Sequence, residues 1–218
     1  MVEVLEFEKL GKGKIRISFD NHTSCRLYRA EAAQLQLEEH RILTAAEYEY
    51  LLKEVIGKRA KKRAMFLLEQ MDRSEQKLRE KLAQGEYPEE CIEEAIAYVK
   101  HFHYLDDRRF AANYIRGHMD QLSRQQLSRK LMEKGISRTD IWAAMEEEYP
   151  GEEAGQMERR QILALLRKKH YDPDFCEEKE RNRIYAYLLR RGFRSEDIQW
   201  AFRQQGQTDL TNLLDIIM

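Results

Sequence analysis

The stretch SRQQLSRKLMEKGI, residues 123–136, decides the fold of this 218-residue chain. Ser123, with a glutamine three residues later, has the spacing of a capping box that begins a helix. Leu127 and Leu131 lie four residues apart, so they share one face of that helix and predict a single buried stripe. Gly135 suits the left-handed residue that ends a helix. The stretch therefore predicts a short amphipathic helix followed by a tight turn.

The same pattern occurs three times along the chain. The equivalent positions are Leu127, Leu131, Gly135, Ile136, Ile141 and Met145 in the middle copy, Ile184, Leu188, Gly192, Phe193, Ile198 and Phe202 in the last, and Leu78, Leu82, Glu86, Tyr87, Ile92 and Ile96 in the first. Only Glu86 departs from the pattern, because it replaces the glycine of the turn. A repeat of this length predicts tandem helical units, each packed mainly against its neighbours.

A further amphipathic helix is expected ahead of each pair, at 60–71, 107–121 and 152–168, so the repeating unit has three helices. With only 10 glycines and 3 prolines, the chain is unlike an all-β sandwich or a glycine-rich nucleotide-binding sheet. We expect a mainly α fold, in which three tandem three-helix repeats form an elongated, curved array. The expected domains are an N-terminal hairpin plus helix at 1–57, repeats at 58–105, 106–150 and 151–205, and a short helical tail at 206–218.

The first 28 residues predict a small β-hairpin. Ile15, Ile17 and Phe19 alternate with polar residues after the turn at 11–13, and residues 2–7 would form the preceding strand. A third short strand is expected at 25–27. Two capping patterns mark later helices: Thr44 with its following glutamate begins a helix of the N-terminal region, and Asp174 in the same way begins the middle helix of the last copy.

Several classes of protein are disfavoured. The longest apolar runs, 64–68 and 162–166, fall far short of the roughly 20 residues that cross a bilayer. The N-terminus is acidic and alternating, unlike a secretory signal, so we expect a cytoplasmic protein that does not contact membranes. Three widely separated cysteines indicate ordinary thiols rather than disulfides or a zinc site. The six histidines lack a metal-binding motif, and Asp106 with Asp107 is better explained as a helix cap. We expect no cofactor, no metal and no enzymatic activity.

The charges are informative by their placement, because 38 lysines and arginines nearly cancel 39 aspartates and glutamates. Cations concentrate on the first and middle helices, whereas the third helices at 88–100 and 137–148 each carry a net charge of −3. A recurrent basic face can neutralise phosphates, and an acidic face can meet a basic protein. The candidate nucleic-acid-binding residues are Lys58, Arg59, Lys61, Lys62, Arg63, Arg108, Arg109, Arg129, Lys130, Arg159, Arg160, Lys168, Lys169, Arg190 and Arg191.

Three other interpretations stay open at this point. The charges can simply solvate helices, and the repeats can form an adaptor that binds a protein without nucleic acid. The middle helix, turn and third helix also resemble a helix-turn-helix, repeated three times. In that class the helix after the turn enters the major groove. Here that helix is acidic, which disfavours sequence-specific reading of a duplex.

The repeats resemble those of the RecX regulatory proteins. Residues 63–82 are similar to the family's first repeat, residues 187–198 to its third, and the hairpin to the N-terminal extension of longer members. The resemblance covers about 58–204. The central repeat carries it most clearly, through Tyr104, Leu105, Asp106, Asp107, Arg108, Arg109, Phe110, Ala111, Ser123, Leu127, Leu131, Lys134, Gly135 and Ile136.

This resemblance implies a cytoplasmic bacterial regulator that binds the RecA recombinase filament on single-stranded DNA. Members lodge along the helical groove of the filament and suppress ATP hydrolysis and strand exchange, and many also bind DNA, so double-stranded DNA is a further expected partner. The candidate cations would then contact the filament or its DNA. We expect the chain to act as a monomer in recombination and DNA repair.

Overall fold

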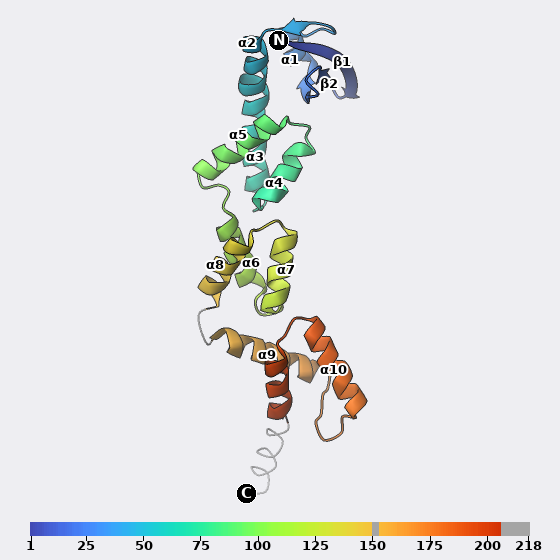
Figure 1. The fold of residues 1–218 in the computed structure, drawn as a ribbon, viewed down its shortest axis with the longest axis vertical. Coiled ribbons are helices and arrows are strands. Elements are labelled where there is room, and N and C mark those ends of the chain that lie inside the picture. Colours follow the sequence, from blue (N-terminus) through green and yellow to red (C-terminus); the bar gives the residue numbers. More distant parts are fainter. Residues whose placement is uncertain (150–152, 206–218) are drawn as a thin grey trace. The chain divides into compact units, whose positions relative to one another are not determined.

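The computed structural model describes residues 1–149 and 153–205. The chain divides into two compact units, Met1–Asp107 and Arg108–Met218. The expected fold class is confirmed: the chain is mainly helical, with three tandem three-helix domains and a small antiparallel sheet at the N-terminus (Figure 1). Within the described residues, no helix combines the length and the apolar composition needed to cross a membrane.

The N-terminal sheet has four strands in the order β3-β2-β1-β4. They are β1 (Val2–Gly11), β2 (Lys14–Phe19), β3 (Ser24–Tyr28) and β4 (Ile42–Leu43). The β1–β2 hairpin and the short third strand agree with the sequence, and Ile15, Ile17 and Phe19 are buried as their alternation requires. The sheet is larger than expected, because a fourth strand, β4, pairs with the start of β1. A short helix that the sequence did not predict, α1 (Arg29–Gln34), follows β3.

A continuous helix leads from the sheet into the first three-helix domain (Figure 1). It consists of α2 (Ala45–Tyr50), a π-helical segment η1 (Leu51–Gly57) and α3 (Lys58–Gln70). The expected cap is present, since the Thr44 hydroxyl accepts a hydrogen bond from the Glu47 amide at 3.2 Å. Tyr50 and Gly57 keep right-handed helical conformations, so the chain passes through both junctions without a break. The basic residues 58–63 therefore follow directly on a helical segment whose residues Leu51 and Ile56 share a core with the sheet.

The sheet and the first three-helix domain share one hydrophobic core. The domain consists of α3, α4 (Glu75–Ala83) and α5 (Glu89–His101). The repeat positions Leu78 and Leu82 are fully buried, Ile92 and Ile96 are 2% exposed, and all four belong to the same cluster as Ile17 of the sheet. Because each buried aliphatic side chain contributes roughly 1.5–3 kcal/mol, the sheet and this domain stabilise each other.

All three copies of the repeat turn have the same backbone conformation, although the first lacks glycine. Glu86 has φ 56°, in the left-handed region that Gly135 and Gly192 occupy at 84°. In each copy the amide of the residue after the turn donates a hydrogen bond to the carbonyl five residues earlier. The N–O distances are 3.4 Å for Tyr87 to Leu82, 3.1 Å for Ile136 to Leu131 and 3.3 Å for Phe193 to Leu188. The glutamate therefore leaves the turn geometry unchanged.

The second unit contains the other two domains, each with its own core. The second domain consists of α6 (Asp107–His118), α7 (Arg124–Glu133) and α8 (Arg138–Glu148). Asp107, the first residue of α6, belongs to the first unit. The third consists of α9 (Glu153–Lys168), α10 (Glu178–Arg190) and a helix at 195–205.

One predicted cap in the third domain is wrong. The middle helix α10 begins at Glu178, with Glu177 as its first flanking residue, and not at Asp174. The Asp174 amide instead donates to the Asp172 carboxylate at 2.9 Å, within a turn that precedes the helix. The expected helical tail at 206–218 lies outside the described residues.

Polar contacts join the second and third domains inside the second unit. The Ser123 hydroxyl, which caps α7, donates to the Arg191 carbonyl at 2.5 Å, and the buried Glu158 carboxylate accepts from the Arg124 amide at 2.9 Å. Gly192 lies at the same joint: a Cβ there would come within 2.9 Å of the Ser123 hydroxyl. The repeat turn of the third domain is thus packed against the helix start of the second.

Candidate nucleic-acid interface

The basic cluster of the first unit follows from the amphipathic pattern of α3. Ala60, Ala64 and Leu67 face the core, so the cations between them spread over the remaining faces of the helix. Three of the five are held by acceptors: Lys58 pairs with Glu54 at 2.7 Å, Arg59 with Glu31 at 2.8 Å, and Lys61 with Glu94 at 3.1 Å.

Lys62 and Arg63 are the two exposed cations of this cluster that keep their charge available. Among the described residues, neither forms an ion pair, and the Arg63 guanidinium lies 5.4 Å from the centre of the Phe66 ring. An unpaired cation on a rigid helix can neutralise a phosphate without first losing another partner. These two residues are therefore the best-placed of the predicted cations on α3.

A pocket of about 480 Å³ opens beside Lys62 and Arg63, between β3, α3 and the turn that joins α4 to α5. We call it the N-terminal pocket. Its principal lining residues are the five cations Lys14, Arg26, Arg59, Lys62 and Arg63 and the two aromatic residues Tyr28 and Tyr87. The Tyr28 ring lies 5.6 Å from the Lys14 ammonium and 5.7 Å from the Arg59 guanidinium. Glu86 is the only carboxylate that lines the pocket in the described part of the chain.

Glu86 is bound from the sheet side and so leaves the pocket positively charged. Its carboxylate accepts a hydrogen bond from Arg16 Nε at 2.7 Å and further contacts from the terminal nitrogens of Arg16 and Arg26. The hydrogen bonds from Arg16, followed by those from Arg26, lower the pKa of Glu86 to about 2. The residue that replaces the turn glycine thus fastens the sheet to the first domain.

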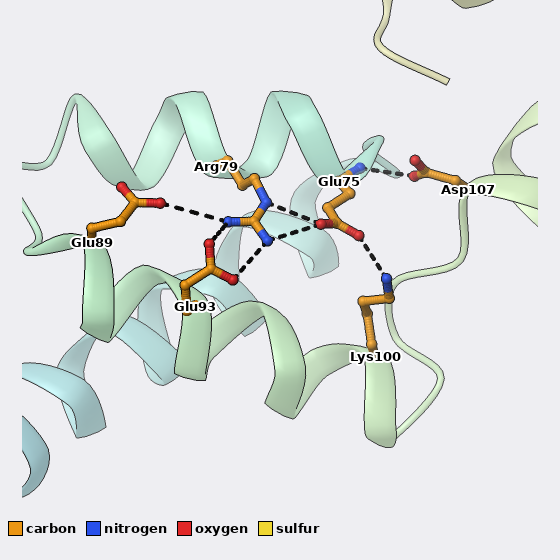
Figure 2. A network of polar contacts seen from close by, with 6 residues as sticks. All are labelled: Glu75, Arg79, Glu89, Glu93, Lys100 and Asp107. Carbon is orange, nitrogen blue, oxygen red and sulfur yellow. Dashed lines mark hydrogen bonds and ion pairs between the residues drawn. The ribbon is translucent and has the colours of Figure 1, made fainter. Parts of the chain in front are cut away.

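The acidic third helix of the first domain is tied to α4 by a network of ion pairs (Figure 2). Arg79 of α4 contacts Glu93 of α5 at 2.9 Å and Glu75 at 3.0 Å, and Glu75 also accepts from Lys100 at 2.7 Å. The Asp107 carboxylate caps the network, because it accepts from the Glu75 amide at 2.8 Å. This cluster holds α4 against α5.

The third helix of the second domain follows the same rule. Glu147 pairs with Arg108 at 3.1 Å and Glu148 with Arg116 at 2.5 Å, so α8 is tied to α6. The sequence predicts basic and acidic sides, and within this domain these oppositely charged helices bind each other. Arg108 therefore has an intramolecular partner.

The remaining predicted cations divide into three groups. Two have structural partners: Arg159 binds Asp197 at 2.7 Å, and Arg191 donates to the Tyr187 hydroxyl at 3.0 Å. Arg109 has contacts within the chain, Arg129 is 3.8 Å from Glu133, and Lys169 lies 4.2 Å from the centre of the Tyr187 ring. The exposed or half-exposed cations of α7, α9 and α10 are Lys130, Arg160, Lys168 and Arg190.

Sequence reasoning missed four of the seven principal lining residues of the N-terminal pocket. Lys14, Arg26 and Tyr28 come from the sheet and Tyr87 from the repeat turn, and none of them belongs to a basic cluster in the sequence. The available signal was the glutamate in place of the turn glycine, because a carboxylate at a left-handed position indicates a partner elsewhere. That partner is the sheet, which lies 60 to 70 residues away along the chain.

Comparison with known proteins decides the family. Three sequence profiles match in order: "RecX, first three-helix domain" at residues 60–98, "RecX, second three-helix domain" at 106–145 and "RecX, third three-helix domain" at 158–202. The chain belongs to the RecX family. Together the matched domains cover more than half of the chain, and they coincide with the three helical domains described above. The N-terminal sheet lies outside all three.

Individual RecX proteins agree with this assignment. The chain is similar to "Regulatory protein RecX" of Caldanaerobacter subterraneus subsp. tengcongensis, with 29% identity over 77% of this chain and 81% of the relative. It is 35% identical to the RecX protein of Cronobacter sakazakii over 65% of this chain and 88% of that one. A solved structure of regulatory protein RecX superposes with a TM-score of 0.60 at 21% identity, covering 91% of this chain and 98% of the other, which supports the fold.

A second solved structure, RecX from Lactobacillus salivarius, has a TM-score of 0.59 at 19% identity and covers 70% of this chain and 97% of that one.

The RecX relatives are named as regulatory proteins, and RecX is not a recognised enzyme family. The family therefore supports a regulatory role for this chain.

Proposed function

We propose that this RecX protein binds the RecA filament on single-stranded DNA and inhibits its ATP hydrolysis and strand exchange. The observation that carries the proposal is the ordered match of all three RecX domains to the three helical domains of the chain. RecA is the partner that membership of this family implies, and its filament is a repeating, polyanionic target. A chain of tandem units suits such a target, because successive domains can meet successive subunits.

The mechanism we propose is competitive occupation of the filament groove. Helical domains lodge along the groove, and exposed cations such as Lys62 and Arg63 contact phosphates of the bound strand. The occupied groove then blocks subunit motion and access of a second strand. No covalent bond is made or broken, so binding free energy alone supplies the inhibition.

The rival is a helical adaptor that binds a protein partner without nucleic acid. The extensive pairing of cations with carboxylates, such as Arg108 with Glu147 and Arg159 with Asp197, favours this rival, because paired cations are less available to phosphates. The two functions differ in their response to salt. For single strands, the logarithm of the binding constant falls by about 0.7 per contacted phosphate for each unit of log salt concentration.

The proposal is tested by co-sedimentation with RecA filaments assembled on a long oligothymidylate in the presence of a non-hydrolysable ATP analogue. We expect the protein to pellet with the filament. In a control at high salt that contains the oligothymidylate but no RecA, the protein should remain in the supernatant. Replacement of Lys62 and Arg63 by glutamate should weaken pelleting while the helical circular-dichroism signal is retained. Absence of the wild-type protein from the filament pellet would exclude the proposed partner.

A further inference from the structure

The N-terminal pocket combines groups that the matched RecX domains do not contain by themselves. Lys14, Arg26 and Tyr28 come from the sheet, outside the matched residues 60–98, whereas Lys62 and Arg63 come from α3. The two elements share one hydrophobic core, and the Glu86 ion pairs fasten them together. The pocket is therefore a fixed recess rather than a chance gap between mobile parts.

The pocket carries a strong excess of positive charge. Of the five cations that line it, Arg26 is paired with Glu86 and Arg59 with Glu31, whereas Lys14, Lys62 and Arg63 form no ion pair with the described residues. An anion with several acceptor oxygens would satisfy these donors, and phosphate is the group that lysine and arginine bind most readily in this way.

The pocket also offers aromatic surface beside the cations. Tyr28 is 43% exposed, and Tyr87, which also lines the pocket, is half-buried. Burial raises the pKa of the Tyr87 hydroxyl, so the ring stays neutral. Aromatic rings next to a positively charged groove are the arrangement on which bases of single strands stack. A carboxylate-rich peptide would use the cations but has no flat aromatic group to stack on the rings, whereas a nucleotide base has one.

We propose that the N-terminal pocket binds a nucleotide unit, with its phosphate on Lys62, Arg63 and Lys14 and its base against the tyrosine rings. The volume of about 480 Å³ lies within the range of small-ligand sites. A single strand can place an unpaired base in such a recess, whereas the bases of a duplex are stacked inside it. The inference deepens the proposed function and rests on it only for its biological setting, since the binding itself requires no RecA.

Direct binding without RecA tests the pocket. The anisotropy of a fluorescein-labelled 12-residue oligothymidylate is titrated with the full chain at several salt concentrations. The test variant is Lys62→Ala with Arg63→Ala. The control is Lys53→Ala with Lys81→Ala, which removes the same charge from exposed positions of the same unit outside the pocket.

We expect the test variant to lose affinity at least tenfold and to lower the salt slope by about 1.4, because two phosphate contacts are removed. The control should change either quantity little. Tyr28→Leu should weaken binding about 5- to 150-fold through loss of one stacked base, and Tyr28→Phe should preserve it. Equal affinities of the test variant and its control, or tighter binding of an oligoglutamate than of the oligonucleotide, would overturn the proposal.

Two further experiments distinguish free nucleotides from single-stranded DNA as the ligand, and the nucleotide site from the proposed inhibition of RecA. Competition by free thymidine monophosphate or ATP that depends on Tyr28 assigns the pocket to free nucleotides, and competition by unlabelled strand alone assigns it to single-stranded DNA; both support a nucleotide site. RecA inhibition is measured with the same proteins. Pocket variants that lose the oligonucleotide but inhibit RecA as well as wild type keep the nucleotide site and contradict the role given to Lys62 and Arg63 in the filament groove. Wild-type protein that binds the strand without affecting RecA refutes the proposed function alone.

Discussion

Neutralisation of Glu86 should destabilise the first unit, because this side chain fastens the sheet to the first three-helix domain. Glu86→Gln keeps the left-handed backbone, the size of the side chain and one carbonyl oxygen, but removes the charge. In the folded protein Arg16 Nε donates to this carboxylate at 2.7 Å, and Arg16 and Arg26 add further contacts. The substitution therefore isolates the electrostatic part of the attachment.

The magnitude follows from the partial burial of the cluster. The Glu86 side chain is 23% exposed and its two arginine partners 32% and 37%. Hydrogen bonds to charged groups contribute roughly 1.5–3 kcal/mol when shielded, whereas exposed ion pairs contribute about 0.2–1 kcal/mol. An intermediate site of this kind should lose about 1–2 kcal/mol of unfolding free energy at pH 7. Glu8→Gln is the matched control, because Glu8 also contacts Arg16 but is 52% exposed, and it should cost less than about 0.5 kcal/mol.

The pH dependence gives a second, independent signal. Arginine contacts lower the pKa of Glu86 from 4.5 to about 2, so the unfolded chain takes up a proton at higher pH than the folded one. The stability that Glu86 contributes is therefore complete above pH 4.5 and is lost as the pH falls toward 2. The difference between wild type and Glu86→Gln should shrink over the same interval.

Backbone amide exchange in β2 and β3 is the appropriate assay. The two tryptophans of the chain, Trp142 and Trp200, both lie in the second unit, so intrinsic tryptophan fluorescence does not follow the first. The slowest amides of the sheet report the free energy of opening. A loss no larger than that of Glu8→Gln, or a difference that persists unchanged at pH 2, would refute the role given to Glu86.

The second unit offers further tests by urea denaturation followed through tryptophan fluorescence. Gly192→Ala should cost about 2–3 kcal/mol, because Gly192 has φ 84° and a Cβ would lie 2.8 Å from the Gln125 Cβ. Gly117→Ala, which meets nothing within 4 Å inside α6, should instead stabilise by about 0.5–1 kcal/mol, and equal effects of the two would contradict the packed joint. Burial raises the pKa of Glu158, so its ionisation opposes folding as the pH rises above 4.5. Glu158→Gln should therefore make the stability of this unit less dependent on pH between 4.5 and 7, and an unchanged pH profile would count against a buried carboxylate at the joint.

The local pattern of the repeats was sufficient to predict the helical domains. Leu127 and Leu131 are fully buried, and Ser123 caps α7 as its spacing requires, because helix faces and caps depend on residues three or four apart. The failure at Asp174 has a local cause as well. An aspartate with a glutamate three residues later suits a turn and a helix start equally. In the structure Asp174 belongs to a turn that precedes the helix.

Features that depend on distant residues could not be predicted in this way. Helix α1 and strand β4 are short and are stabilised by packing against the sheet, and the π-helical segment at Leu51–Gly57 has no distinctive sequence pattern. The same holds for the candidate site. The cluster at 58–63 was visible as a run of charge, but its separation into paired and unpaired cations depends on Glu31 and Glu94, which other elements bring to α3.

The most direct test of the account is the rate of RecA ATP hydrolysis on single-stranded DNA as this protein is added. We expect the rate to fall in a saturable manner at fixed RecA and DNA concentrations, and the fall to be reduced for Lys62→Glu with Arg63→Glu. A control with excess DNA separates inhibition of the filament from sequestration of the strand. A hydrolysis rate that does not change at any concentration of the wild-type protein would contradict the central claim that this chain regulates RecA.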